Sequence, residues 1–168
     1  MTRGFHRTLQ KGFRRTGNPD LVNDISRYCF GADILKQYTL GLVQDDQLKS
    51  LSRDIWKRIS EYVNINEIFI KKFVSKIHWY DISVRQVISE PFIREFQDKV
   101  YWSHISYYQV FSESFIREFQ DKVDWYGISA VQKLSESFIR EFQDKVDWEQ
   151  IRRRKLLSAE SLKQFKHY

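Results

Sequence analysis

A nine-residue string, Phe-Ile-Arg-Glu-Phe-Gln-Asp-Lys-Val, occurs three times in this chain and constrains its fold more than any other feature. The copies begin at Phe92, Phe115 and Phe138, so each starts 23 residues after the one before it. The five tryptophans keep the same spacing, at Trp56, Trp79, Trp102, Trp125 and Trp148. A fixed period in this range is typical of stacked supersecondary units, each of which packs on its neighbours.

The apolar residues of the best copy predict one helix. Phe138, Ile139, Phe142 and Val146 lie on one side of a helical wheel, which predicts a helix of about eleven residues with a compact apolar face. Ser135 is a preferred N-cap residue for it. On its outer face we expect ion pairs between residues four apart, Glu141 with Lys145 and Arg140 with Asp144.

A second, shorter helix is predicted to begin at the tryptophan of each copy, with Asp124 or Asp147 as its cap. Trp125, Ile128, Ser129 and Gln132 share one side of this helix, and a serine recurs at the position of Ser129, where a small side chain lets helices approach closely.

The predicted fold is therefore all-α: a short α-solenoid of 23-residue two-helix repeats with a basic N-terminal arm. A single unit cannot bury its own aromatic residues, so neighbouring units must cover them. The predicted repeat core consists of Trp56, Trp79, Trp102, Trp125, Trp148, Phe96, Phe119 and Phe142.

The spacing divides the chain into three parts: a basic arm over 1–18, degenerate helical units over 19–55, and the repeat array over 56–168. In the degenerate part, Phe30, Leu35, Tyr38 and Leu42 fall where apolar core residues fall in a full copy. An irregular insertion around residues 39–47 follows them.

Charge separates the two ends of the chain from the repeats between them. The net charge of the whole chain is +6. Residues 79–147 are mildly acidic, with eight basic against twelve acidic residues. The candidate contacts for a partner or for phosphate are Arg3, Arg7, Lys11, Arg14, Arg15, Arg152, Arg153, Arg154 and Lys155. In the arm, Phe5, Leu9 and Phe13 form a possible docking stripe if that segment is helical.

The sequence offers no constellation that predicts catalysis, so we expect no enzyme. Glu95, Glu118 and Glu141 recur beside Arg and Lys, which is typical of an exposed charge ladder. The histidines have no ligand spacing and Cys29 is single, so we expect no metal, no disulfide and no cofactor. We also expect no small-molecule substrate.

The expected cellular location is argued from the absence of long apolar segments in the sequence. No run of about 20 apolar residues is present, which argues against a transmembrane segment. The first residues contain no apolar h-region, which argues against secretion. We expect an intracellular protein or a component of a particle assembled inside a cell.

The unit Trp-x-x-Ile-Ser-x-x-Gln-x-Leu-Ser-Glu-x-Phe-Ile-Arg-Glu-Phe-x-Asp-Lys-Val-Asp, clearest at 125–147, resembles short tandem repeats in proteins of giant DNA viruses of the mimivirus-like and marseillevirus-like groups. The resemblance covers residues 56–168 and, weakly, 22–55. It implies a viral protein, either a virion component or a module that contacts the host, and it transfers no functional residues.

We expect a non-catalytic scaffold that mediates protein–protein contacts, with a minor capsid or virion-associated role as its viral version and capsid subunits as its partners. One alternative is nucleic-acid binding or packaging through the basic ends. Against it, the best copies show near-identical outward residues, which cannot read varied bases, and their net charge is negative. Another alternative is an adaptor that binds host proteins.

Overall fold

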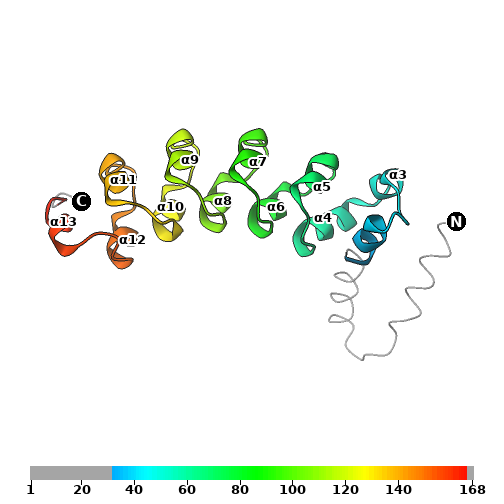
Figure 1. The fold of residues 1–168 in the computed structure, drawn as a ribbon, viewed down its shortest axis with the longest axis horizontal. Helices are drawn as coiled ribbons and strands as arrows, with labels where there is room; N and C mark the ends of the chain where they lie inside the picture. The colour runs from blue at the N-terminus through cyan, green and yellow to red at the C-terminus, as the bar shows by residue number, and fades with distance from the viewer. Residues whose placement is uncertain (1–31, 166–168) are drawn as a thin grey trace, which may run out of the picture. The chain divides into compact units, whose positions relative to one another are not determined.

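The computed structural model describes residues 32–165 of the chain. The basic arm, its stripe of Phe5, Leu9 and Phe13, and Cys29 lie outside the described residues. Within 32–165 every regular element is a helix and none is a strand, which confirms the all-α repeat fold (Figure 1). The chain forms two compact units, one ending at His78 and the other beginning at Trp79.

The first unit contains a helix over 32–39, α3 (Asp45–Lys49), α4 (Arg53–Tyr62) and α5 (Glu67–Lys72). Trp56 on α4 is its central residue, with 1% of its surface exposed. The Trp56 ring lies 5.1 Å from the ring of Phe73, centroid to centroid, and its Nε1 donates to the Leu48 carbonyl at 3.2 Å. This buried aromatic cluster joins α3, α4 and the turn after α5.

The predicted irregular insertion is an ordered helix end followed by α3. Gly41 ends the helix over 32–39 with φ at 74°, a conformation that glycine adopts without strain. The amide of Leu42 donates to the Gln37 carbonyl and that of Gly41 to the Tyr38 carbonyl, which is the Schellman pattern. The prediction that Leu42 is a core residue is wrong: this cap turns its side chain into solvent, where it is 70% exposed.

The second unit repeats one pair of helices. The first member of each pair begins at a tryptophan, and we call these the Trp helices: α6 (Trp79–Arg85), α8 (Trp102–Tyr108), α10 (Trp125–Val131) and α12 (Trp148–Arg153). The second members begin at glutamate, and we call these the Phe helices: α7 (Glu90–Glu95), α9 (Glu113–Glu118) and α11 (Glu136–Glu141). The last pair ends with α13 (Ala159–Lys163).

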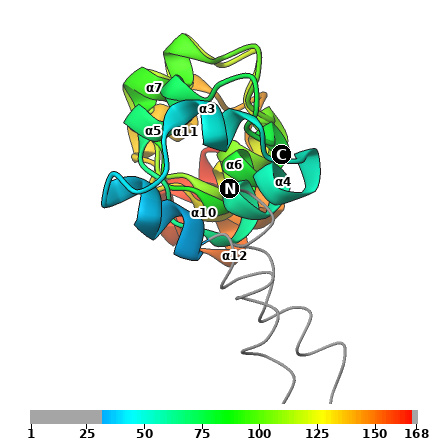
Figure 2. The ribbon, with the colours of Figure 1, turned by 90° about the vertical axis from the view of Figure 1, so that its right-hand side faces the viewer.

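The two kinds of helix form two rows. Figure 1 shows the Trp helices of the second unit side by side in one row, in agreement with the contacts of α8 with α6 and α10 and of α10 with α12. The Phe helices form the other row, and in the end-on view α7 lies above α6, and α11 lies above α10 and α12 (Figure 2). The core lies between the rows, where Phe138, Ile139 and Ile128 are fully buried.

The predicted caps are present, but the Phe helix is shorter than predicted. Ser135 accepts from the Phe138 amide at 3.2 Å, and Asp124 and Asp147 cap the helices that follow them. The predicted length of about eleven residues is wrong, because α11 has six residues and ends at Glu141. Phe142 leaves helical geometry, and its carbonyl accepts the amides of both Lys145 and Val146 in a separate turn.

The helix ends at Glu141 because contacts between repeats outweigh the weak helix propensity of so short a segment. The turn presents the backbone carbonyl of Gln143 to the indole Nε1 of Trp148 at 2.9 Å. It also sends Lys145 to the preceding repeat, where its ammonium lies 3.0 Å from an Asp121 carboxylate oxygen. Phe142 and Val146 remain buried, as their position on the wheel predicts.

Candidate interaction surface

The tryptophans of the predicted core occupy two environments. Trp56 is buried, whereas Trp79, Trp102, Trp125 and Trp148 are partly exposed. Each partly exposed ring packs on phenylalanine; for example, the Trp125 centroid lies 5.1 Å from that of Phe142. The indole Nε1 of Trp125 donates to the Gln120 carbonyl at 3.0 Å. Of the core phenylalanines, Phe119 and Phe142 are buried and Phe96 is half-buried.

A buried serine on each Trp helix joins it to the next repeat. The hydroxyl oxygen of Ser106 accepts the Asp124 amide at 2.9 Å, and that of Ser129 accepts the Asp147 amide at 2.9 Å. Ser83 does the same for the Tyr101 amide at 3.0 Å. The recurring serine therefore supplies an acceptor to the next Trp helix in addition to the small size that the sequence suggested.

A buried glutamine forms the second polar link between Trp helices. Nε2 of Gln132 donates to the Gln109 carbonyl at 2.7 Å and to the Ser106 carbonyl at 3.2 Å, and its Oε1 accepts the Phe111 amide at 3.0 Å. Gln109 repeats the arrangement one repeat earlier, with the Gln86 carbonyl and the Ile88 amide as partners. Because both ends of each amide are used, this polar row satisfies buried backbone groups that would otherwise be costly.

The charged residues of the Phe helices pair both between repeats and within one helix. Glu141 and Lys145 do not pair with each other as predicted, because Glu141 pairs with Arg117 and Lys145 with Asp121. Arg94 lies 2.8 Å from Glu118 of the next repeat and 3.8 Å from Glu90 of its own helix, and Arg117 lies 2.8 Å from Glu141 and 3.6 Å from Glu113. Each guanidinium also covers a phenylalanine of the next repeat; the Cζ of Arg117 is 5.0 Å from the Phe138 ring centroid. These ion pairs lie at the surface, so each contributes only about 0.2–1 kcal/mol, and the buried rows carry more of the stability.

The last repeat modifies each of these links. Lys155 stands where the next glutamine would be, and its neighbour Arg154 supplies the donor instead, from Nη1 to the carbonyls of Ser129 and Gln132 at 2.9 and 2.7 Å. Arg140 meets no glutamate in the next repeat and pairs with Glu136 in its own helix. The bond from Arg140, followed by that from the Ser161 hydroxyl, lowers the pKa of Glu136 below its usual value of 4.5.

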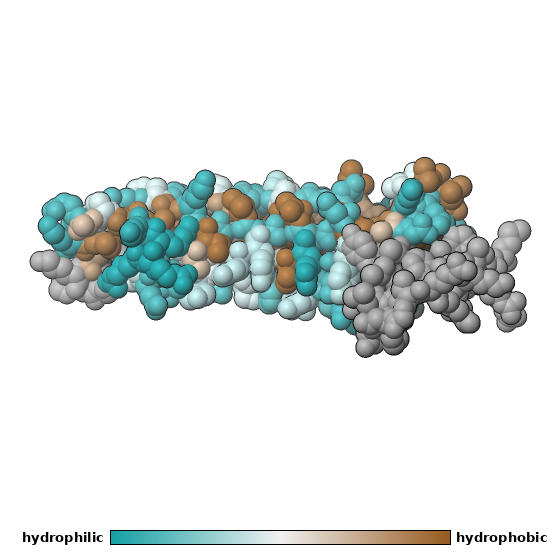
Figure 3. Space-filling model, turned by 90° about the horizontal axis from the view of Figure 1, so that it is seen from below, coloured by the Kyte–Doolittle hydropathy of each residue, from teal (hydrophilic) through white to brown (hydrophobic). Residues whose placement is uncertain are grey.

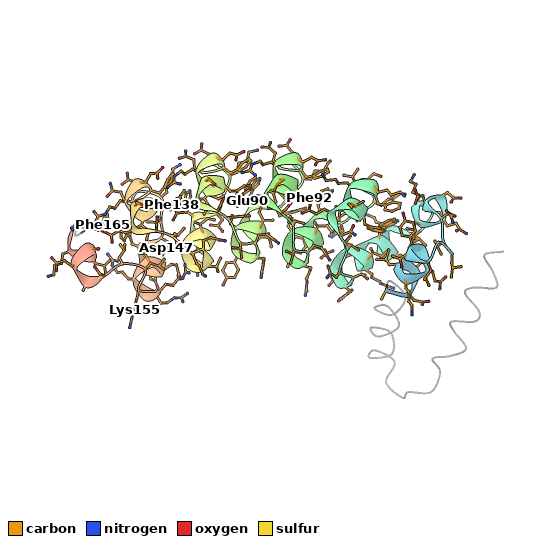
Figure 4. All side chains as sticks on the ribbon, viewed as in Figure 1. Glu90, Phe92, Phe138, Asp147, Lys155 and Phe165 are labelled. Atoms are coloured by element: carbon orange, nitrogen blue, oxygen red, sulfur yellow. The ribbon has the colours of Figure 1, made fainter. Side chains whose placement is uncertain are left out.

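The predicted C-terminal basic cluster therefore divides by role. Arg154 is a half-buried structural donor, and the guanidinium of Arg152 lies 6.0 Å from the Trp148 ring centroid. Arg153 and Lys155 are exposed. Figure 4 shows Lys155 pointing away from the Phe-helix row. The other predicted basic contacts, from Arg3 to Arg15, lie outside the described residues.

An aromatic surface lies on the outer side of the Trp helices, opposite the core. Each helix has a fully buried isoleucine, such as Ile105, and the residue two positions later lies about 200° around the helix from it, on the solvent side. The exposed tyrosines are 42–56% accessible. We call this surface the tyrosine face. It is formed by Tyr80, Tyr107, Tyr126 and Arg153, and at its edge by two further exposed residues, Tyr108 at the end of α8 and Lys155 in the turn after α12.

In the first unit a polar trio forms where α3, α5 and the helix over 32–39 meet. Lys72 lies 2.8 Å from Asp45 and donates to the Tyr38 hydroxyl at 3.0 Å, and that hydroxyl donates to Asp45 at 2.8 Å. The bond from Lys72, and then that from Tyr38, lowers the pKa of Asp45 below its usual 3.8. The bonds that Lys72 makes to Asp45, and then to Tyr38, raise the pKa of Lys72 above 10.5. Beside the trio, an open groove of about 520 Å³ is lined by Leu35, Val63, Ile65, Ile68 and Phe69.

Among residues 32–165, no three His, Cys, Asp or Glu side chains lie close enough together to hold a metal ion. Over the same range, no helix is both long and apolar enough to cross a membrane.

Neither the tyrosine face nor the role of the buried glutamines Gln86, Gln109 and Gln132, which we call the glutamine row, was predicted from the sequence. A signal for the glutamine row was present, since Gln86, Gln109 and Gln132 recur with the repeat on the inner side of the helix. The signal for the tyrosine face was that the second and sixth positions of the Trp helices change between copies, whereas the tryptophan at the first position and the isoleucine at the fourth do not.

Comparison with known proteins gave no match: no family model, no curated protein and no solved structure is significantly similar to this chain.

Proposed function

We propose that this chain is a non-catalytic helical repeat scaffold that mediates protein–protein contacts. The observation that carries the proposal is the tyrosine face, where four tyrosines stand 42–56% exposed on a row of helices held side by side by buried hydrogen bonds. Tyrosine is enriched at protein interfaces because its ring supplies contact area and its hydroxyl a hydrogen bond. A rigid row of helices holds these side chains at fixed spacing for a partner.

A photo-crosslinking amino acid at two positions tests this proposal. Placed at Tyr107 of the full chain in its native cells, it should yield crosslinks to one or a few defined proteins. Placed at Pro91, an exposed position on a Phe helix, it should yield far fewer. Equal labelling from both positions, or labelling of nucleic acid alone, would contradict the proposal.

The narrower version of the proposal is a minor capsid or virion-associated protein whose partners are capsid subunits. It is supported by the resemblance of the repeats to those of giant DNA viruses and by the basic arm with Phe5, Leu9 and Phe13. Detection of the chain in purified particles, and its loss from them when residues 1–17 are deleted, is the expected result. Unchanged incorporation of the shortened chain would count against the docking role of the arm.

Nucleic-acid packaging through the basic ends is the second candidate function, favoured by the exposure of Arg153 and Lys155. It predicts binding to duplex or single-stranded DNA that weakens steeply with salt, and weakens further when residues 152–155 are neutralised. A flat salt response would exclude it.

A further inference from the structure

The three repeats over 79–147 differ from one another mainly in and just after their Trp helices, and two of the variable positions lie on the tyrosine face. At the second position of the Trp helices, all four residues are exposed: Tyr80, Ser103, Tyr126 and Glu149. Four positions later, again on the solvent side, the residues are Val84, Tyr107, Ala130 and Arg153. The outward residues of α9 and α11, by contrast, are identical. A partner that reads this protein at a defined register therefore finds its distinguishing features on the Trp-helix row.

The charge of the tyrosine face also changes along its length. The helix α12 and the turn after it carry four consecutive basic residues, 152–155, against one exposed acidic residue, Glu149. Arg154 makes the links to α10, whereas Arg153 and Lys155 are exposed. Among α6, α8 and α10 the one lysine or arginine is Arg85 at the end of α6, and α8 exposes Tyr107 and Tyr108. Figure 3, which views the Trp-helix side, shows a dense cluster of hydrophilic residues near the α12 end, with further hydrophilic residues along the row.

This distribution favours one class of ligand. A nucleic acid carries phosphates at even spacing, so a surface that follows it needs cations along the whole path. Here α8 supplies none. A polypeptide can carry its charge at one end and apolar side chains along the rest, which matches a surface that is cationic at α12 and aromatic over α8 and α10.

We infer that the tyrosine face binds a polypeptide segment whose carboxylates lie over Arg153 and Lys155 and whose apolar side chains lie over Tyr107, Tyr108 and Tyr126. The inference rests on the proposed scaffold function and names the chemistry of its partner. The tyrosine rings bury the apolar part of the segment and keep their hydroxyls for hydrogen bonds at its edge. The cations at α12 fix its direction, because the reversed segment would place carboxylates over uncharged aromatic residues.

The test begins with a random 16-residue peptide library displayed on phage and selected on the full chain. The inference predicts enriched sequences with Asp or Glu clustered at one end and aromatic or aliphatic residues in the remainder. The strongest binder, made as a fluorescent peptide, should lose roughly tenfold or more of its affinity when Arg153→Glu and Lys155→Glu are combined, and a similar amount with Tyr107→Ser. Its affinity should also fall as salt rises.

The matched control carries the same two charge reversals at exposed lysines in the turns after α7 and α9, Lys99→Glu with Lys122→Glu. This control should bind the peptide within about twofold of the unchanged protein, because these lysines lie off the tyrosine face. Circular dichroism of each variant shows whether it is folded, and a peptide with its acidic block moved to the other end tests direction.

The outcomes separate this inference from the function it rests on. Peptides that bind equally to the Arg153/Lys155 variant and the lysine control would overturn the inference and leave a protein-binding scaffold. A selection that yields no binder overturns the inference. If a labelled single-stranded 20-mer oligonucleotide then binds and is displaced by salt, the scaffold proposal falls as well and nucleic-acid packaging replaces it.

Discussion

Replacing Gln132 by leucine tests whether the buried glutamine row holds the second unit together. Leucine has nearly the same size but removes three hydrogen bonds, to the carbonyls of Gln109 and Ser106 and from the amide of Phe111. Gln132 is only 2% exposed, so water cannot replace these partners without opening the helix pair.

The magnitude follows from the number of groups left without a partner. Each lost hydrogen bond costs about 1 kcal/mol net, and the orphaned Phe111 amide adds about 1–3 kcal/mol. Burying the leucine side chain returns about 1.5–3 kcal/mol. We expect Gln132→Leu to lower the free energy of unfolding of the second unit by about 1–4.5 kcal/mol.

The assay is urea denaturation of the full chain followed by circular dichroism, with hydrogen exchange of the Phe111 amide as a local readout. The matched control is Gln143→Leu, a half-buried glutamine whose backbone carbonyl, not its side chain, receives the Trp148 indole. That control should change stability by less than about 0.5 kcal/mol. If the two variants unfold at the same urea concentration and exchange the Phe111 amide equally fast, the glutamine row contributes no net stability and our reasoning is wrong.

Three further perturbations address other links. Ser106→Ala removes the acceptor for the cap residue of α10 and should cost about 1–2 kcal/mol in urea denaturation; no loss would show that water replaces the hydroxyl. Glu141→Gln breaks a surface ion pair with the arginine of the preceding repeat, and its cost, below about 1 kcal/mol, should disappear in 1 M salt. The pKa of Asp45 is lowered in the folded chain by Lys72, so its contribution to stability is present above pH 3.8 and is lost as the pH falls through the folded value. Acid unfolding of the first unit should therefore depend less on pH in Asp45→Asn than in the control Asp46→Asn, and equal profiles would contradict this assignment.

The repeat period predicted the fold well because it is a long-range signal that local propensity cannot imitate. The caps at Ser135, Asp124 and Asp147 followed from the same residues and are present. The length of the Phe helix did not follow, because its end is decided by the bond between Trp148 and Gln143 and by the reach of Lys145 to another repeat. Such contacts join residues of different units, and helical periodicity within one unit carries no information about them.

The tyrosine face escaped sequence reasoning for a related reason. The positions that are identical in the three strings form links between neighbouring repeats, as Arg94 and Glu118 do. Residues such as Tyr107 and Arg153 differ between copies, so the repeat pattern alone does not predict that they share a surface. Only the packing of the isoleucine two positions earlier shows that they share one exposed side.

The polar links of the second unit have a consequence for how such a chain can change its length. Each one joins a residue to a partner in an adjacent copy, as Ser106 joins the amide of Asp124 and Gln132 joins the carbonyl of Gln109, so none reaches beyond the next copy. A duplicate of residues 113–135 inserted after residue 135 would meet on either side the same acceptors and donors that its parent meets. Recombination in the gene can therefore add or remove whole 23-residue copies, while the modified last pair still covers the end of the array. The number of repeats, and with it the length of the array, can change in equal steps.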